Sequence, residues 1–205
     1  MAYCIAVGYS AQNITENISV PTYTSTIPAL TVNGWIIFQQ RLNPSDSFEY
    51  LWNDYKNGFQ STNGSFWLGN EIVYQLTSSG NYKLRMEMLS PVYGWVSAEY
   101  YSFQLDDEAG FYRINLAGYS GDCGDSMDYD GDNDWYYNDG MYFTTLDSDN
   151  DLLEDGNCAQ ERGGGWWYNE CFYALFNGNG SEGMTWNTLP DPYLSVTRMM
   201  LKKLD

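Results

Sequence analysis

The sequence predicts an α+β fold in one domain, in which antiparallel strands and short helices precede a long segment rich in loops. Residues 82–90 and 95–105 alternate apolar and polar side chains, as antiparallel strands do. Residues 46–59 carry apolar side chains at helical spacing. After residue 121 this periodicity stops until a final strand at 193–204. A chain of 205 residues is long enough for one sizeable core, and no repeat or linker divides it.

The elements before residue 60 are one predicted strand and one predicted helix. Residues 1–33 are rich in Thr, Ser, Ile and Val and are interpreted as irregular strands or an arm. The segment 34–42, GWIIFQQRL, is largely apolar and favours a buried strand. The helix expected within 46–59 has Ser47 as its N-cap and Gly58 as its stop.

The middle of the chain predicts a second helix and three strands. The second helix lies around 70–76, and a third strand, at 111–121, follows 82–90 and 95–105. The aperiodic stretch beyond it is rich in Gly, Asp, Asn and Trp. Inside a compact domain, a segment of that length without regular structure needs a disulfide, a metal ion or packed aromatic side chains to hold it in place.

The charge of the chain argues against binding to nucleic acid. Asp and Glu number 27 against 9 Lys and Arg, for a net charge of −18. Nucleic-acid binding requires cations that displace phosphate counterions, and an anionic membrane surface is disfavoured for the same reason. Thirteen of the carboxylates fall between Ile114 and Glu161, where there is no Lys or Arg. This block is either a solvated acidic surface or a region neutralised by a hard cation such as Ca²⁺.

The chain has no histidine, which excludes Ser-His-Asp and Cys-His catalysis and His-based zinc sites in their usual forms. Its four cysteines are widely spaced without a CxxC pair, so disulfides in a secreted, extracellular protein are expected. No run is long and apolar enough to cross a membrane, and the first residues lack the pattern of a signal peptide. Four glycosylation sequons agree with that setting: Asn13, Asn17, Asn63 and Asn179.

Seven strings between residues 34 and 205 resemble, in order, the fibrinogen-related domain, the C-terminal globe of fibrinogen chains, ficolins, tachylectins and angiopoietins. They are GWIIFQQRL, FWLGNEIVYQLT, YKLRMEM, AEYYSFQL, YRINLAGYSGDCGDSM, FTTLDSDNDLLEDGNCA and GGGWWYNEC. The resemblance implies a globe with a central antiparallel sheet over 34–205. It also implies a loop-rich subdomain, about 118–190, with one Ca²⁺ and a ligand pocket. Residues 1–33 match poorly and form a divergent N-terminal arm.

The segment DSDNDLLEDGNC, residues 147–158, is the predicted calcium site. It is not an EF-hand, because its sixth residue is Leu152 instead of Gly and its twelfth is Cys158 instead of Glu. The resemblance implies two carboxylate ligands and two backbone carbonyls, with one further carboxylate as a water-bridged or outer ligand. The carboxylate ligands would be Asp149 and Asp151. The carbonyls would come from Leu153 and from Asp155 or Gly156, and Asp147 would be the outer ligand.

A second acidic run could hold a second Ca²⁺ or form a solvated loop. Its carboxylates are Asp128, Asp130, Asp132 and Asp134.

The resemblance also implies a disulfide between Cys158 and Cys171 that closes a short loop. The alternative is two free buried thiols. For the remaining cysteines, a Cys4–Cys123 bridge would pin the N-terminal arm to the loop-rich subdomain. An intermolecular bond from Cys4 is the competing interpretation.

The pocket that lectin-like members use for acetyl groups departs from the family pattern in three places. Its floor pair, joined by a cis peptide bond in the family, corresponds to Glu170–Cys171, where we expect a cis bond if the pocket is kept. Phe172 replaces the family's His, Arg162 replaces a frequent Tyr, and the segment 177–186 is shortened. The predicted lining is Glu161, Arg162, Glu170, Cys171, Phe172, Tyr173 and Trp186.

Two functions are consistent with these features. The first is an extracellular, Ca²⁺-stabilised recognition module that binds a glycan or an acidic or acetylated ligand. The second is a structural or assembly module that contacts another protein or further copies of itself in an oligomer or polymer. An enzyme is not expected, because no carboxylate spacing marks an acid–base pair and the resembled family is non-catalytic.

Overall fold

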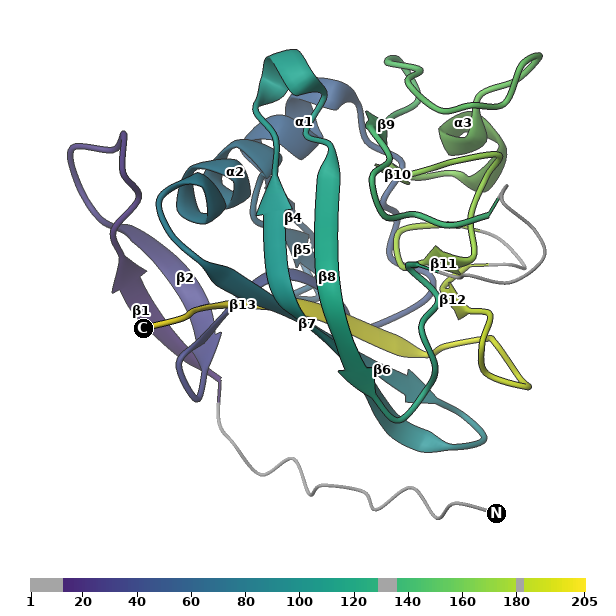
Figure 1. The fold of residues 1–205 in the computed structure, drawn as a ribbon, viewed down its shortest axis with the longest axis horizontal. Coiled ribbons are helices and arrows are strands. Elements are labelled where there is room, and N and C mark those ends of the chain that lie inside the picture. The colour runs from purple at the N-terminus through teal and green to yellow at the C-terminus, as the bar shows by residue number, and fades with distance from the viewer. Residues whose placement is uncertain (1–12, 129–135, 180–182) are drawn as a thin grey trace.

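The computed structural model describes residues 13–128, 136–179 and 183–205 (Figure 1). The elements are, in chain order, β1 (Ile14–Ile18), β2 (Ile27–Val32), β3 (Trp35–Arg41), α1 (Trp52–Asn57), β4 (Phe59–Gln60), β5 (Phe66–Trp67), α2 (Asn70–Ser78), β6 (Tyr82–Ser90), β7 (Gly94–Leu105), the 3-10 turn η1 (Glu108–Gly110), β8 (Ile114–Gly121), β9 (Phe143–Thr144), α3 (Cys158–Arg162), β10 (Trp166–Trp167), β11 (Ala174–Leu175), β12 (Thr185–Trp186) and β13 (Val196–Lys203). The predictions made for Cys4, Asp130, Asp132 and Asp134 concern residues outside the described ranges.

One antiparallel sheet dominates the fold, in the order β1-β2-β3-β13-β6-β7-β8. The last strand of the chain, β13, is inserted between β3 and β6, so the C-terminus closes the middle of the sheet. β5 pairs with the C-terminal half of β3 and carries β4 on its other side. The predicted α+β fold with a central antiparallel sheet is therefore confirmed.

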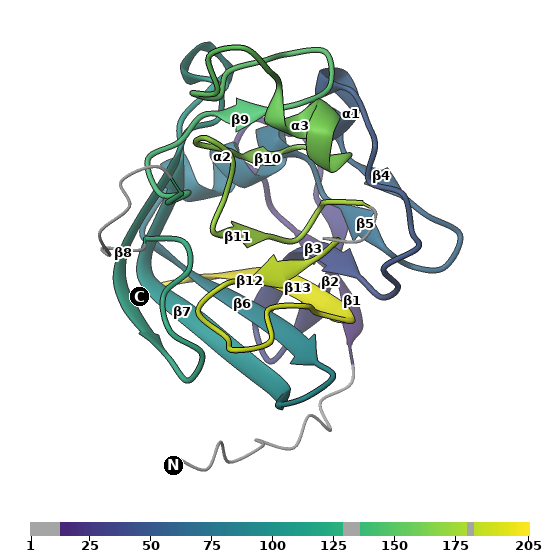
Figure 2. The same ribbon diagram turned by 90° about the vertical axis from the view of Figure 1, so that its right-hand side faces the viewer.

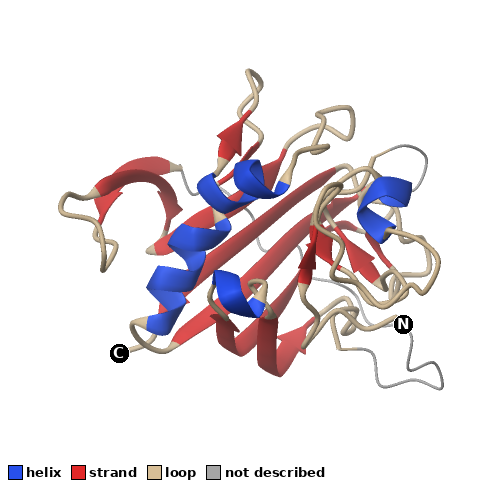
Figure 3. Ribbon diagram, turned by 90° about the horizontal axis from the view of Figure 1, so that it is seen from above, coloured by secondary structure: helices blue, strands red, loops and turns tan. Residues whose placement is uncertain are grey.

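The two larger helices cover one face of this sheet, as the view from above shows (Figure 3). α2 faces the sheet with Ile72, Val73 and Leu76, whose spacing of one and three residues places them on one side of the helix. On β6 the alternate residues Leu84 and Met86 are fully buried and point to the same core. The apolar pattern that predicted these elements is thus the pattern that buries them.

The segment 46–51 is not helical, contrary to the prediction. α1 begins only at Trp52, and its N-cap is Leu51, not Ser47. Phe48 forms an isolated bridge with Gly164 from the loop-rich half, which keeps this segment extended. The predicted stop is confirmed, because Gly58 caps the helix with φ 92°. At that angle a side chain would be strained, and one on Gly58 would also meet the backbone of Leu68 at 2.5 Å.

The first described residues extend the sheet. β1 and β2 form a hairpin, and β2 joins β3 through Thr31 and Val32. The arm predicted for residues 1–33 is therefore, from residue 14 onward, a pair of outer strands.

The loop-rich half lies beside the sheet and holds only two-residue strands (Figure 2). Its aromatic residues continue the core of the sheet half: Trp166, Trp167, Phe176 and Trp186 are fully buried in the same hydrophobic cluster as Leu84 and Met86. The two halves therefore share one core, as expected of a single domain.

Candidate functional site

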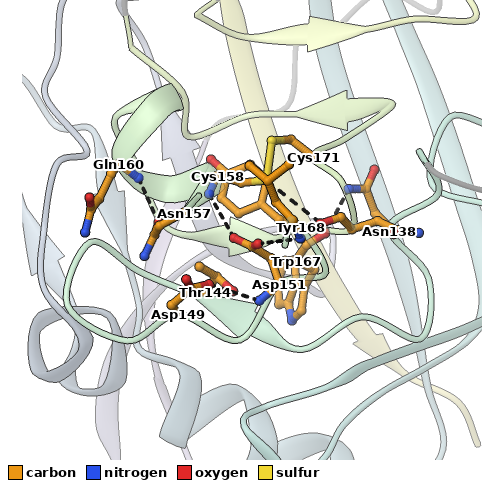
Figure 4. Close-up of a disulfide and its surroundings, with 12 residues drawn as sticks. Asn138, Thr144, Asp149, Asp151, Asn157, Cys158, Gln160, Trp167, Tyr168 and Cys171 are labelled. Carbon is orange, nitrogen blue, oxygen red and sulfur yellow. Dashed lines mark hydrogen bonds between the residues drawn. A yellow bond between two sulfur atoms is a disulfide. The ribbon is translucent and has the colours of Figure 1, made fainter. Parts of the chain in front are cut away.

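A disulfide fixes the start of α3. Cys158 is bonded to Cys171 with their Cα atoms 5.5 Å apart, as predicted (Figure 4). The helix is capped by Asn157, whose side-chain oxygen accepts a hydrogen bond from the Gln160 amide at 2.9 Å. We call residues 147–158 the acidic loop. Asn157 also donates to the carbonyl of Thr145, so the cap ties the start of α3 to the residues just before this loop.

Asp151 is the best-held carboxylate of the acidic loop. Its two oxygens accept hydrogen bonds from the amides of Leu153 at 3.0 Å and Cys158 at 2.8 Å. Burial, together with the neighbouring Asp149 carboxylate, raises the pKa of Asp151 to about 6, although the two backbone hydrogen bonds oppose this shift. The arrangement brings two carboxylates together in a partly buried place, where a bound cation would relieve their repulsion.

Asp147 has a structural task. Its Oδ1 accepts hydrogen bonds from the Trp52 amide at the start of α1 and from the Thr145 hydroxyl, both at 2.8 Å. It also contributes to a hollow at the acidic loop, with Asp149 and Gly156. Three of the six residues predicted for calcium thus share one hollow.

The calcium prediction fits this chain in part. Leu153 is half-buried and Asp155 is exposed, and neither lines the hollow. Among the described residues no group of three or more His, Cys, Asp or Glu side chains is placed to hold a metal. A cage here would depend on Asp149, Asp151 and backbone carbonyls, which is an oxygen set that Ca²⁺ accepts.

A pocket of about 320 Å³ opens beside Cys171, the second cysteine of the disulfide. Four predicted residues line it together: Arg162, Glu170, Cys171 and Phe172. The Arg162 guanidinium lies over the Phe172 ring, 5.4 Å from its centroid. Because Cys171 lines the pocket and the Cys158 amide binds Asp151, one covalent bond joins the pocket to the acidic loop.

Three predicted pocket residues do not line the pocket. Trp186 is fully buried and donates from Nε1 to the Gly124 carbonyl at 3.0 Å, so it supports the core. Glu161 is exposed on α3, and its carboxylate lies close to Gly156 in the acidic loop. Tyr173 is half-buried and accepts at its carbonyl from the Asn187 amide.

The Glu170–Cys171 peptide bond is trans, in contrast to the expectation for a retained acetyl pocket. With Phe172 at the next position, the floor differs from the acetyl-binding pattern in both its backbone and its side chain. Phe172 also leaves the floor without the hydrogen-bond donor that His supplies in the acetyl-binding pattern.

Five lining residues were missed from the sequence: Tyr136, Thr185, Asn187, Pro192 and Tyr193. Four of them come from the segment around β12, which has no periodic pattern to reveal its direction. Thr185 is 3% exposed, and its hydroxyl has no hydrogen-bond partner within the described part of the chain. A buried hydroxyl without a partner is uncommon and calls for an explanation.

Asn13 and Asn17 are exposed on and beside β1, as glycosylation would require, and Asn63 is exposed as well. Asn179 differs, because its side-chain oxygen accepts from the buried Arg41 at 2.8 Å. Its backbone amide donates to the Arg162 carbonyl. Glycosylation stays a prediction at all four.

Cys123 is buried and is not bonded to another cysteine of the described residues, so the predicted Cys4–Cys123 bridge stays a prediction. Its place just beyond the end of β8 leaves it packed under the start of the loop-rich half, against the core. Its proposed partner Cys4 is outside the described residues.

This fold and this arrangement of disulfide, acidic loop and pocket define a fibrinogen-like globe. Residues 27–203 match the family described as fibrinogen beta and gamma chains, C-terminal globular domain, and the chain belongs to that family. The resemblance seen in the sequence is therefore confirmed. Fibrinogen-like domain families are non-enzymatic, which agrees with the prediction that this chain is not an enzyme.

Curated relatives include angiopoietin-related protein 2 of Mus musculus, 44% identical over 138 residues, or 67% of this chain and 26% of that protein. Fibrinogen-like protein 1 of Mus musculus is 36% identical over 184 residues, covering 82% of this chain and 58% of the relative. The chain thus spans about a quarter of the first relative and somewhat over half of the second.

Two solved structures are similar along nearly the whole chain. The fibrinogen-like globe domain of human ANGPTL2 has a TM-score of 0.82 at 32% identity, covering 94% of this chain and 93% of that one. A lamprey fibrin D-dimer in complex with the peptide Gly-His-Arg-Pro-amide has a TM-score of 0.83 at 28% identity, covering 94% and 71%. In the part of the chain that the structure describes, no helix is long and apolar enough to span a membrane.

Proposed function

We propose that this chain is an extracellular recognition module whose pocket receives the amino-terminal end of a protein partner. Glu170 supplies a carboxylate for the terminal ammonium group, and the Thr185 hydroxyl supplies a further hydrogen-bonding group. Phe172 and Tyr193 offer aromatic walls for the following side chains. The disulfide between Cys158 and Cys171 supports an extracellular setting.

The observation that carries this proposal is a pocket that combines a half-buried carboxylate with a buried hydroxyl lacking a partner among the described residues. The solved lamprey fibrin structure, which is similar to this chain, holds a short peptide that begins with glycine. A ligand with a free amino terminus is therefore the first one to test. Phe172, which stands in place of the family's His, cannot donate a hydrogen bond to an acetylated sugar, so that sugar is the second ligand to test.

The experiment measures binding of Gly-His-Arg-Pro-amide by calorimetry, beside the same peptide with an acetylated amino terminus. We expect the free peptide to bind and acetylation to weaken it about tenfold or more, because the ammonium–carboxylate contact is lost. Glu170→Gln should cause a similar loss for the free peptide only. Glu161→Gln is the matched control, since Glu161 is exposed on α3 and does not line the pocket.

Equal binding of both peptides would contradict the proposal. Binding of N-acetylglucosamine with no binding of either peptide would favour the glycan interpretation instead. If neither ligand binds and light scattering shows concentration-dependent oligomers, the assembly function would replace the proposal.

We further propose that Ca²⁺ binds Asp149 and Asp151 together with carbonyl oxygens of the segment 153–156. The ion would neutralise carboxylates in the most acidic part of the chain and stabilise the loop that the disulfide joins to the pocket. This proposal is supported by the shared hollow of Asp149 and Gly156 and by the partly buried Asp151.

Calcium calorimetry and thermal melting test this second proposal. We expect one site, and a gain of about 2.7 kcal/mol in the free energy of unfolding at a free Ca²⁺ concentration 100 times the Kd. Asp149→Ala with Asp151→Ala should abolish both effects, while Asp128→Ala should leave them unchanged. A wild-type protein that neither binds Ca²⁺ nor melts higher in its presence would show that the acidic run is a solvated surface.

A further inference from the structure

Apolar side chains from three segments far apart in the sequence gather on the surface at the start of α1. The aromatic patch, as we name it, consists of Leu51, Trp52, Phe111 and Tyr142. The ring of Phe111 stands edge-on to Trp52 at 6.5 Å and to Tyr142 at 5.7 Å, measured between centroids. Leu51, Phe111 and Tyr142 are 49%, 43% and 40% exposed. Figure 1 shows the segment between β7 and β8 reaching up beside α1, where this patch forms.

The backbone beneath the patch is in an unusual conformation. Phe111 has φ 51° and ψ 36°, and Tyr112 follows with φ 47°. These are left-handed values, which favour Gly or Asn and are uncommon for aromatic residues. Tyr112 gains burial in return, since it is fully buried and stacks on Trp52 at 5.7 Å. Phe111 does not, because much of its ring faces solvent.

Packing holds this conformation in place. The Phe111 amide donates to the Glu108 carbonyl at 3.0 Å, and the Phe111 carbonyl accepts from the Phe143 amide at 2.9 Å. The Tyr112 hydroxyl donates to Glu71 on α2 at 2.8 Å. The exposed ring of Phe111 is thus displayed on a rigid support. A strained, exposed aromatic on such a support indicates a surface selected for contact.

Carboxylates border one side of the patch. Asp54 accepts from the Leu51 amide at 3.1 Å, Asp147 accepts from the Trp52 amide at 2.8 Å, and Glu108 accepts from the Trp52 indole at 3.1 Å. Of these three carboxylates, Glu108 pairs with Lys56 at 2.6 Å. Asp54 and Asp147 have no ion pair to a described residue.

A second cation, Arg113, lies beside Tyr142 of the patch. Arg113 lies 5.8 Å from the centre of the Tyr142 ring and donates to the Gly140 carbonyl. Aromatic residues and Arg are the side chains that most often dominate protein interfaces. A chain with a net charge of −18 also attracts a basic partner over a distance.

We propose that the aromatic patch is a docking surface for a protein segment that presents apolar side chains flanked by basic residues. The apolar side chains would cover Phe111, Trp52 and Tyr142, and the basic groups would face Asp54 and Asp147. This surface is separate from the pocket at Glu170, so the proposal stands whether or not a peptide enters that pocket.

The test uses three fluorescein-labelled peptides of twelve residues. The first alternates Leu and Trp with Lys, the second replaces each Lys by Glu, and the third replaces each Leu and Trp by Ser. Fluorescence anisotropy measures their affinity for the wild type and for three variants at two salt concentrations. The variants are Phe111→Gly, Tyr142→Ser and Tyr101→Ser. Tyr101 is a matched control, being 68% exposed on β7 and outside the patch.

We expect the apolar basic peptide to bind most tightly, and Phe111→Gly and Tyr142→Ser each to weaken it about tenfold. Tyr101→Ser should leave the affinity within about twofold of the wild type. Phe111→Gly should not lower the melting temperature, because Gly accepts the left-handed backbone more readily than Phe. Binding would then be lost without a loss of fold.

Three results would overturn the proposal. Equal loss in Tyr101→Ser, or no loss in the patch variants, would show non-specific attraction to an acidic protein. Equal affinity for the acidic and basic peptides would show that the surface does not require basic residues in its partner. Self-association that the patch variants abolish, measured by light scattering, would make a second copy of the chain the occupant.

Discussion

The two halves of this molecule satisfy their backbone polar groups in different ways. In the sheet half, strands such as β6 and β7 pair with one another over long registers. In the loop-rich half the strands are two residues long, and buried side chains take over. Asn138 donates to the Trp167 carbonyl at 2.8 Å and accepts from the Ala174 amide at 3.0 Å. Asn177 likewise donates to the Gly165 carbonyl.

The junction between the halves uses the same device. Arg41, at the end of β3, is fully buried and donates to the carbonyls of Phe176, Gly178 and Pro44 and to the Asn179 side chain. Burial lowers the pKa of its guanidinium to about 10, so it remains charged at neutral pH. One charged side chain thus supplies the hydrogen-bond donors that strand pairing supplies in the sheet. More of the free energy of unfolding therefore depends on single residues here.

The largest expected effect comes from removing that side chain. Arg41→Met should lower the free energy of unfolding by about 3–5 kcal/mol, because several buried carbonyls lose their donor at once. Denaturant unfolding measures the loss. The control is Lys83→Met on β6, where about 0–1 kcal/mol is expected because Lys83 pairs with Glu99 at 3.6 Å and both side chains are 27% exposed. Equal losses in both variants would break the contrast between junction and sheet.

The next effect concerns the disulfide. Cys158→Ser with Cys171→Ser should cost about 3 kcal/mol, because the open loop gains entropy in the unfolded chain. Hydrogen exchange should quicken mainly in the loop-rich half, between 144 and 175, while β6 and β7 keep their protection. A uniform increase over the whole chain would mean that the two halves unfold as one unit.

The smallest effect is a local one at the thiol beyond β8. Burial, with the nearby Asp122, raises the pKa of Cys123 to about 12, and the residue is 4% exposed. Alkylation of native protein by iodoacetamide at pH 8 should therefore run at least about 100-fold slower than in denaturant. Mass spectrometry of denatured, unreduced protein should find two alkylated cysteines. Finding none would show that Cys4 and Cys123 are bridged.

The sequence predicted most of the sheet half and less of the pocket. Alternation along 82–90 and 95–105 identified β6 and β7 because one face of each strand is buried. The helix within 46–59 was placed too early, since the bridge from Phe48 to Gly164 outweighs local helix preference. The pocket was identified only where motif strings marked it, at Arg162, Glu170, Cys171 and Phe172. Pro192 was missed because it lies in the aperiodic stretch, and Tyr193 because it was placed in the final strand, which begins only at Val196.

By itself the sequence determined the fold class, the family, the pairing of Cys158 with Cys171 and the acidic character of the 147–158 loop. These features are local patterns or ordered motifs, which the chain carries before it folds. Only the tertiary structure decided that Trp186 is core, that Asp147 accepts from the first amide of α1 and that Phe111 meets Trp52 and Tyr142 on the surface. Those facts depend on contacts between residues tens of positions apart, and packing, not local preference, sets such contacts.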